Sequence, residues 1–65
     1  MNIILNGERR EIRGLTVADV LAEIGLENAR VATALNGEFL PASLRGETKL
    51  SDGDALEVLA AMQGG

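Results

Sequence analysis

The chain has no cysteine and no histidine among its 65 residues. Without cysteine there is no disulfide framework, and without histidine as well the usual zinc and iron ligands are missing. The common nucleophile–base pairs also need one of these two residues, so the serines and threonines have no imidazole to activate them. These absences argue against a self-contained enzyme, and we expect no metal site and no bound cofactor.

Long apolar runs and basic charge are also scarce. The longest apolar stretches fall far short of the roughly 20 residues that span a bilayer, and residues 1–5 lack the basic region of a signal peptide. Ten acidic against six basic residues give a net charge of −4, whereas nucleic-acid binding needs a basic footprint. We therefore expect a cytoplasmic protein with neither a membrane nor a nucleic-acid partner.

Two Asn-Gly pairs, at Asn6-Gly7 and Asn36-Gly37, each separate two short apolar or alternating segments. Asn-Gly favours the type I′ turn that joins antiparallel strands, so each pair predicts a hairpin. Pro41 has no N–H for a ladder hydrogen bond and should end the fourth strand. The strands predicted in this way cover residues 1–5, 8–12, 31–35 and 38–40.

One short helix is predicted between the hairpins. Thr16 and Asp19 have the spacing of a capping box. Gly25 is placed to end the helix in the left-handed conformation, with Leu26 folding back on Leu21. A helix of about two turns is not stable alone in water, so it must pack on a sheet. Its apolar residues fall at i, i+3, i+4 and i+7 on one stripe: Val17, Val20, Leu21 and Ile24.

The second half of the chain predicts a crossover, a turn and a last strand. Residues 42–49 form an irregular crossover in which Leu44 is expected to point inward. Asp52 and Asp54 flank Gly53 in a turn and lack the further ligands that calcium needs. In the last strand, residues 55–60, alternation should turn Leu59 away from the face that the helix covers.

The order β-β-α-β-β-β predicts an α+β fold of the β-grasp type, a mixed sheet with one helix packed on one face. A domain at residues 1–61 is followed by a flexible tail, residues 62–65, that ends in Gly64-Gly65. Glycine has no Cβ, so such a tail can lie extended in a channel too narrow for other residues. We therefore expect Gly65 to carry the chemistry on its carboxylate, with Gly64, Gln63 and Met62 threading into a partner.

The face of the sheet that the helix leaves open is a second candidate site. If the strand registers follow one alternation, four apolar residues could share this face: Leu59, Ile4, Ala32 and Ala34. Continuous apolar patches on small monomers often mark protein interfaces, whereas scattered exposed apolar residues are normal. We expect a docking face here, because a partner that acts on the tail must also recognise the body of the protein.

Five segments of the chain carry a resemblance to a known family: Met1-Asn2-Ile3-Ile4-Leu5-Asn6-Gly7-Glu8, Thr16-Val17-Ala18-Asp19-Val20-Leu21, Val31-Ala32-Thr33-Ala34-Leu35-Asn36-Gly37-Glu38, Asp52-Gly53-Asp54 and Gln63-Gly64-Gly65. Through them the whole chain resembles the ThiS family of sulfur carrier proteins, which are small ubiquitin-like β-grasp domains of thiamin biosynthesis. Many members have an arginine after the proline that corresponds to Pro41 and a tryptophan a few residues later, whereas this chain has Ala42-Ser43-Leu44 and no tryptophan.

This resemblance implies a specific chemistry at Gly65. An adenylating enzyme of the ubiquitin-activating type would use ATP and magnesium to convert the Gly65 carboxylate into an acyl-adenylate. Sulfur from a persulfide donor would displace AMP and leave a thiocarboxylate, and thiazole synthase would take that sulfur for thiazole formation. No residue of this chain need act as acid or base.

Two alternatives share the fold and the Gly-Gly tail. One is the small subunit of molybdopterin synthase, also a sulfur carrier, whose chains tend to be longer. The other is a ubiquitin-like modifier that forms isopeptide bonds with target lysines. A third hypothesis, an adaptor domain with an inert tail, predicts that deletion of Gly64-Gly65 changes nothing.

Overall fold

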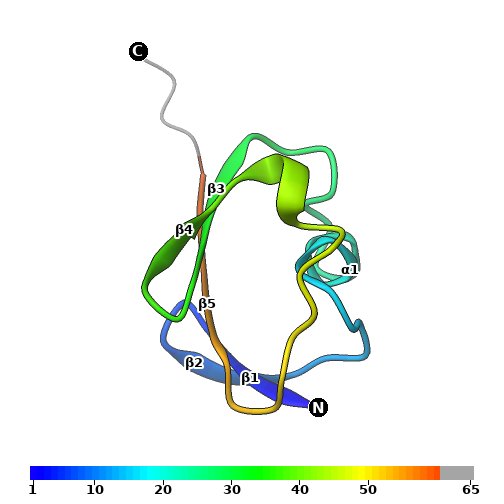
Figure 1. Cartoon of the computed structure of the whole chain (residues 1–65). Coiled ribbons are helices and arrows are strands. Elements are labelled where there is room, and N and C mark those ends of the chain that lie inside the picture. The colour runs from blue at the N-terminus through cyan, green and yellow to red at the C-terminus, as the bar shows by residue number, and fades with distance from the viewer. Residues whose placement is uncertain (61–65) are drawn as a thin grey trace.

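The computed structural model describes residues 1–60, so the predicted tail residues Met62, Gln63, Gly64 and Gly65 lie outside the described part (Figure 1). Both hairpins, the single helix and the last strand occur where the sequence predicts them. The elements are β1 (Asn2–Leu5), β2 (Glu8–Glu11), α1 (Val17–Glu23), β3 (Val31–Leu35), β4 (Glu38–Leu40), the 3-10 helix η1 (Ala42–Leu44) and β5 (Ala55–Ala60).

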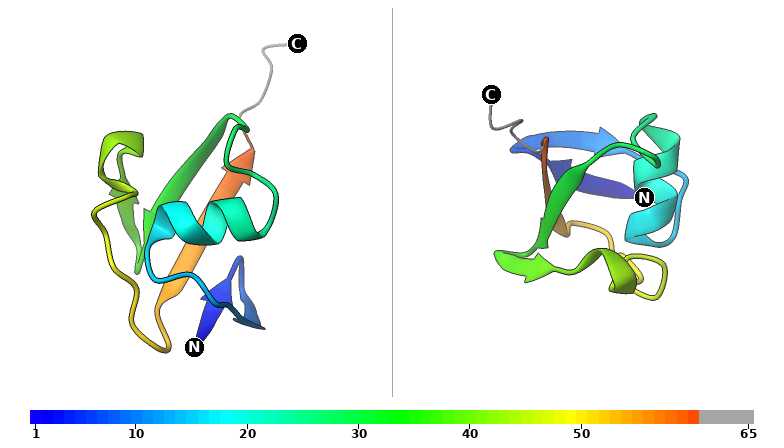
Figure 2. Two further views of the ribbon diagram at one scale, coloured as in Figure 1. Left: turned by 90° about the vertical axis from the view of Figure 1, so that its right-hand side faces the viewer. Right: turned by 90° about the horizontal axis from the view of Figure 1, so that it is seen from above.

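The five strands form one mixed sheet in the order β2-β1-β5-β3-β4. The last strand, β5, lies in the centre, parallel to β1 and antiparallel to β3. Figure 2 shows α1 lying across one face of this sheet, and within residues 1–60 no helix lies on the other face. The predicted β-grasp architecture is therefore confirmed.

Local hydrogen bonds begin and end α1 as predicted. The Thr16 side chain accepts from the Asp19 N–H at 3.1 Å, and the Asp19 carboxylate accepts from the Thr16 N–H in return, which completes the capping box. At the other end Gly25 has a φ of +84°. The N–H groups of Leu26 and Gly25 donate to the carbonyls of Leu21 and Ala22, the two bonds of a Schellman motif.

The core lies between α1 and the sheet. The structure corrects the prediction for Leu44, whose side chain is 43% exposed because η1 turns it outward. Leu50, at the end of the crossover, fills the core instead. The buried apolar residues are Ile3, Ile12, Val17, Val20, Leu21, Leu50, Leu56 and Val58.

Gly14 lies where the chain passes directly against the start of α1. A Cβ at this position would stand 2.6 Å from the Asp19 Cβ and 3.1 Å from the Asp19 carbonyl carbon. Because both atoms belong to a capped helix, Gly14→Ala is expected to destabilise the fold by about 1–3 kcal/mol. Urea unfolding measures this change. Gly46→Ala, where an added Cβ meets nothing within 4 Å, should leave the midpoint nearly unchanged; equal losses would contradict the steric argument.

Two carboxylates hold the loop that leads into α1. Glu23 accepts hydrogen bonds from the N–H groups of Arg13 and Gly14, and these bonds lower the pKa of Glu23 below its ordinary 4.5. Hydrogen bonds from the N–H groups of Leu15 and Thr16 lower the pKa of Asp19 below its ordinary 3.8 in the same way.

The lowered pKa values predict how stability depends on pH. Each carboxylate binds protons more weakly in the folded than in the unfolded chain, so its contribution is complete above the ordinary pKa and is lost as pH falls through the lowered value. We expect stability to decline below about pH 4.5. In Glu23→Gln this decline should be shallower in urea titrations taken at several pH values; a parallel curve would contradict the assignment.

Candidate docking face and C-terminal tail

The open face of the sheet presents an apolar surface over β5, β3 and β4. The register places Ala32 opposite Leu59 and Ala34 opposite both Glu57 and Phe39. Phe39 is 71% exposed and Leu59 is 65% exposed. These two strands flank β3, and a continuous exposed apolar patch on a small monomer often marks a protein interface.

These residues line a shallow trough of about 150 Å³. The two alanines of β3 form its floor because their side chains are small, while Phe39 of β4 and Leu59 of β5 stand on its two sides. Apart from Thr33 and the carboxylate of Glu57, the lining residues are apolar. We call the surface formed by Ala32, Thr33, Ala34, Phe39, Glu57 and Leu59 the docking trough.

The docking trough brings together three of the four residues that the sequence analysis assigned to this face. Ile4 points to the same side, since its neighbour Ile3 is fully buried under α1. However, Ile4 pairs with Ala55 at the beginning of β5, four residues before Leu59, and it does not line the trough. Phe39 was missed. Alternation along the last strand does turn Glu57 to the same side as Leu59, but Glu57 was not counted among the docking residues.

A buried polar cluster beneath the docking trough fixes β3 and β4. Thr33, 1% exposed, donates from its hydroxyl to the Leu40 carbonyl at 2.9 Å and accepts from Arg45 Nε at 3.0 Å. Arg45 Nη2 also donates to the Val31 carbonyl at 2.7 Å. Because β4 ends at Leu40, opposite Thr33, it does not extend alongside Val31. The Arg45 guanidinium therefore supplies the donor that a paired strand would give to the Val31 carbonyl. These hydrogen bonds connect β3 to the end of β4 and to the crossover.

The trough lies at the end of β5 from which the tail continues. Leu59 precedes Ala60, the last residue of β5. Residues 61–65 add at most about 17 Å of chain, so Gly65 cannot be farther than that from the end of the strand. The docking trough and the residue from which the tail continues are therefore adjacent.

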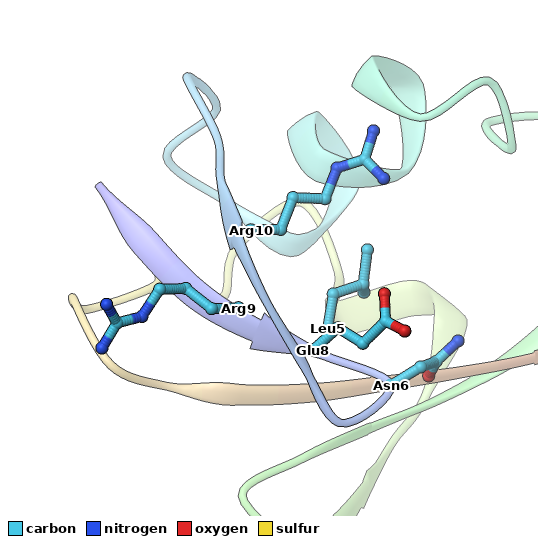
Figure 3. Close-up of a pocket in the computed structure, with 5 residues that line it drawn as sticks. All are labelled: Leu5, Asn6, Glu8, Arg9 and Arg10. Carbon is cyan, nitrogen blue, oxygen red and sulfur yellow. The ribbon is translucent and has the colours of Figure 1, made fainter.

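A second hollow lies on the β1–β2 hairpin, lined by Leu5, Asn6, Glu8, Arg9 and Arg10. Figure 3 shows that Arg9 points to one side of β2 while Arg10, Glu8 and Leu5 point to the other. The charged groups therefore do not converge on one point. β2 is an edge strand, and exposed charges on edge strands discourage pairing with other chains.

The predicted turn around Gly53 is confirmed, and the side-chain carboxylates of both of its aspartates accept hydrogen bonds from backbone N–H groups. Asp52 accepts from the Asn2 N–H at 2.8 Å, and Asp54 accepts from the Ser51 N–H at 2.8 Å. Asp54 also accepts from the Asn36 side-chain amide at 3.2 Å. The two carboxylates thus connect this turn to β1 and to the second hairpin.

The comparisons with known proteins match this fold along the full chain. Residues 3–65 match the model of the ThiS family. The chain belongs to the ThiS family. Sulfur carrier protein ThiS of Thermus thermophilus is 46% identical over 61 residues, which cover 94% of this chain and 95% of that relative. A crystal structure of a thiamine biosynthesis protein (ThiS) from Geobacter metallireducens has a TM-score of 0.85 at 36% identity and covers 100% of both chains.

A longer protein also contains a region similar to this ThiS-family chain. A thiazole synthase of Paramagnetospirillum magneticum is 36% identical over 66 residues; the match includes all of this chain but only 20% of the synthase. The chain therefore spans about a fifth of that relative. In residues 1–60, no helix has the length and apolar character needed to cross a membrane.

Proposed function

We propose that this protein is a sulfur carrier of thiamin biosynthesis that bears the sulfur as a thiocarboxylate on Gly65. The observation that carries the proposal is the family match, which extends through Gly65, together with 46% identity to a sulfur carrier protein. The docking trough adds support because it lies directly beside the origin of the tail.

A free carboxylate is a poor electrophile, so the Gly65 carboxylate must be activated before sulfur can be attached to it. The Gly65 carboxylate attacks the α-phosphorus of ATP, pyrophosphate leaves, and an acyl-adenylate forms in the active site of an adenylating enzyme. The terminal sulfur of a persulfide then attacks the acyl carbon and AMP leaves. A thiol reduces the resulting acyl disulfide and is itself oxidised, which releases the thiocarboxylate. Magnesium accompanies the ATP and belongs to the partner's site.

The sequence suits this role because the chain has no thiol that could compete with the persulfide. It has no cysteine, so no internal thiol can attack the acyl-adenylate or accept the sulfur. The two glycines allow the tail to enter narrow channels in successive partners. The catalytic groups belong to those partners.

The proposed acceptor of the sulfur is thiazole synthase. A protein of that name contains a region similar to the whole of this chain, and two functions joined in one polypeptide commonly act on each other. In the proposed transfer, the docking trough would be covered where the carrier domain meets the synthase.

Intact mass tests the proposal. The protein is incubated with ATP, magnesium, an adenylating enzyme of the ubiquitin-activating type, a persulfide donor and a thiol. A mass gain equal to sulfur minus oxygen, located on Gly65 by fragmentation, is expected. New adducts joined to the lysines of other proteins would instead indicate a modifier. No change with an enzyme that activates another ThiS-family carrier would contradict the proposal.

A further inference from the structure

The geometry points to Asn6 as a positioning residue that fixes the direction in which β5 delivers the tail. This inference rests on the proposed function, because it concerns the presentation of Gly65 to a partner. Asn6 makes no contact with a reacting atom. It acts through the backbone of Val58, two residues before the end of β5.

Regular pairing between β1 and β5 stops before β5 ends. The register joins Ile4 to Ala55 and Leu5 to Leu56, and the Asn6 N–H still donates to the Leu56 carbonyl at 2.9 Å. At Asn6 the chain then turns into the hairpin with a φ of +50°. The backbone of β1 is therefore no longer available to Val58.

The Asn6 side chain replaces the missing peptide group. Its Oδ1 accepts from the Val58 N–H at 2.8 Å, and its Nδ2 donates to the Val58 carbonyl at 3.1 Å. A primary amide carries the same donor and acceptor pair as a peptide unit, so the ladder continues for one further step. Figure 3 shows the Asn6 side chain beside the ribbon of β5.

These two hydrogen bonds are the last that β1 and its turn make with β5 within residues 1–60. On the opposite side β3 pairs with β5 as far as Val31 and Ala60. The final residues of β5 thus have ladder partners on β3 along their whole length and hydrogen bonds on the β1 side only through Asn6. Without that amide, the end of β5 is hydrogen-bonded from one side alone, so its direction is less restricted.

The direction of β5 matters because reaction requires the carboxylate in line with its partner. A displacement of about 1 Å at a reacting group can reduce a rate by as much as 100-fold. The docking trough fixes the body of the carrier, and the last residues of β5 connect that body to the tail. A change in their direction should therefore lower the rate of the chemical step more than it weakens docking.

Asn6→Asp tests this role. The substitution keeps the shape of the side chain and tolerates a positive φ, but it removes the donor and sets a carboxylate oxygen against the Val58 carbonyl. In ATP–pyrophosphate exchange with the adenylating enzyme, kcat is expected to fall about tenfold while the KM for the carrier stays within about twofold. Asn6→Gly, which loses the amide without adding charge, should act in the same direction.

Asn36→Asp is the matched control. Asn36 has nearly the same φ, +52°, and its Oδ1 accepts from the Ala55 N–H at 2.9 Å, at the beginning of β5. Its Nδ2 donates to Asp54, so Asn36→Asp also loses a donor and sets two carboxylates together. It should cost at least as much stability, yet leave kcat unchanged because it lies far along β5 from the tail.

Amide hydrogen exchange supplies a readout independent of activity. Val58 is expected to lose protection in Asn6→Gly, while amides of α1 remain protected. The positioning role is overturned if folded Asn6 and Asn36 variants lose kcat equally, or if neither loses any. If the wild-type protein supports no exchange with an enzyme that adenylates another ThiS-family carrier, the proposed function fails instead.

Discussion

Gly65→Ala is expected to reduce sulfur loading by about 100-fold or more while leaving the fold intact. The added Cβ widens the tail at the reacting residue, so the carboxylate can no longer reach the adenylation geometry in a channel shaped for glycine. Deletion of Gly64 and Gly65 should abolish loading completely. The rate of acyl-adenylate formation, followed by pyrophosphate release, measures both effects.

Gly46→Ala is the control, because it adds the same Cβ to a glycine outside the tail, where that Cβ meets nothing within 4 Å. Its loading rate should stay close to that of the wild type. Thermal unfolding of all three variants should match the wild type, since the core described in the structure lies between Ile3 and Val58. If Gly65→Ala were loaded at the wild-type rate, the steric explanation of the glycine pair would be wrong.

Leu59→Glu is expected to weaken binding of the adenylating enzyme by about 30-fold, equivalent to about 2 kcal/mol for a residue at the centre of an interface. The substitution places a charge at the side of the docking trough, next to Glu57, and removes apolar area that the partner would cover. Because Leu59 is 65% exposed, the fold should tolerate the change. Isothermal titration calorimetry gives the dissociation constant directly.

Leu15→Glu is the control for an exposed leucine outside the docking trough. Leu15 is 63% exposed, and it lies in the loop before α1 rather than on the open face of the sheet. Its substitution should leave the dissociation constant nearly unchanged. Equal losses for the two variants would show that general charge repulsion, rather than the trough, accounts for the effect.

The sequence predicts the elements of this fold well where local chemistry decides them. Asn-Gly fixes both hairpins because asparagine and glycine tolerate positive φ, and the Thr16–Asp19 box with Gly25 fixes both ends of α1. In each case the determining residues are neighbours in the chain.

The sequence predicts less where contacts join distant segments. Leu44 lies within the crossover and Leu50 at its end, and neither has a periodic pattern around it that assigns a direction to its side chain. In the structure the short helix η1 turns Leu44 outward, and Leu50 is buried. The bonds from Asn6 to Val58 join residues 52 positions apart, and those from Arg45 to Val31 and Thr33 cross from the crossover to β3. No local pattern indicates such pairs.

In the candidate site, too, local patterns predict some residues, while others depend on the pairing of distant segments. Alternation along β5 predicts the exposure of Leu59, and its register with β3 then brings Ala32 and Ala34 beside it. Phe39 was missed because β4 has only three residues, too few for alternation to assign a face without the register. Ile4 shares the face, but the parallel register with β5 places it beside Ala55.

Transfer of labelled sulfur tests the central claim most directly. The wild-type protein is loaded from a persulfide donor carrying isotopically labelled sulfur, purified, and then mixed with thiazole synthase and its other substrates. We predict that the label is found first on Gly65 and afterwards in the thiazole product, in equal amount. Label that reaches the product without passing through Gly65, or that never enters the protein, would contradict the carrier role.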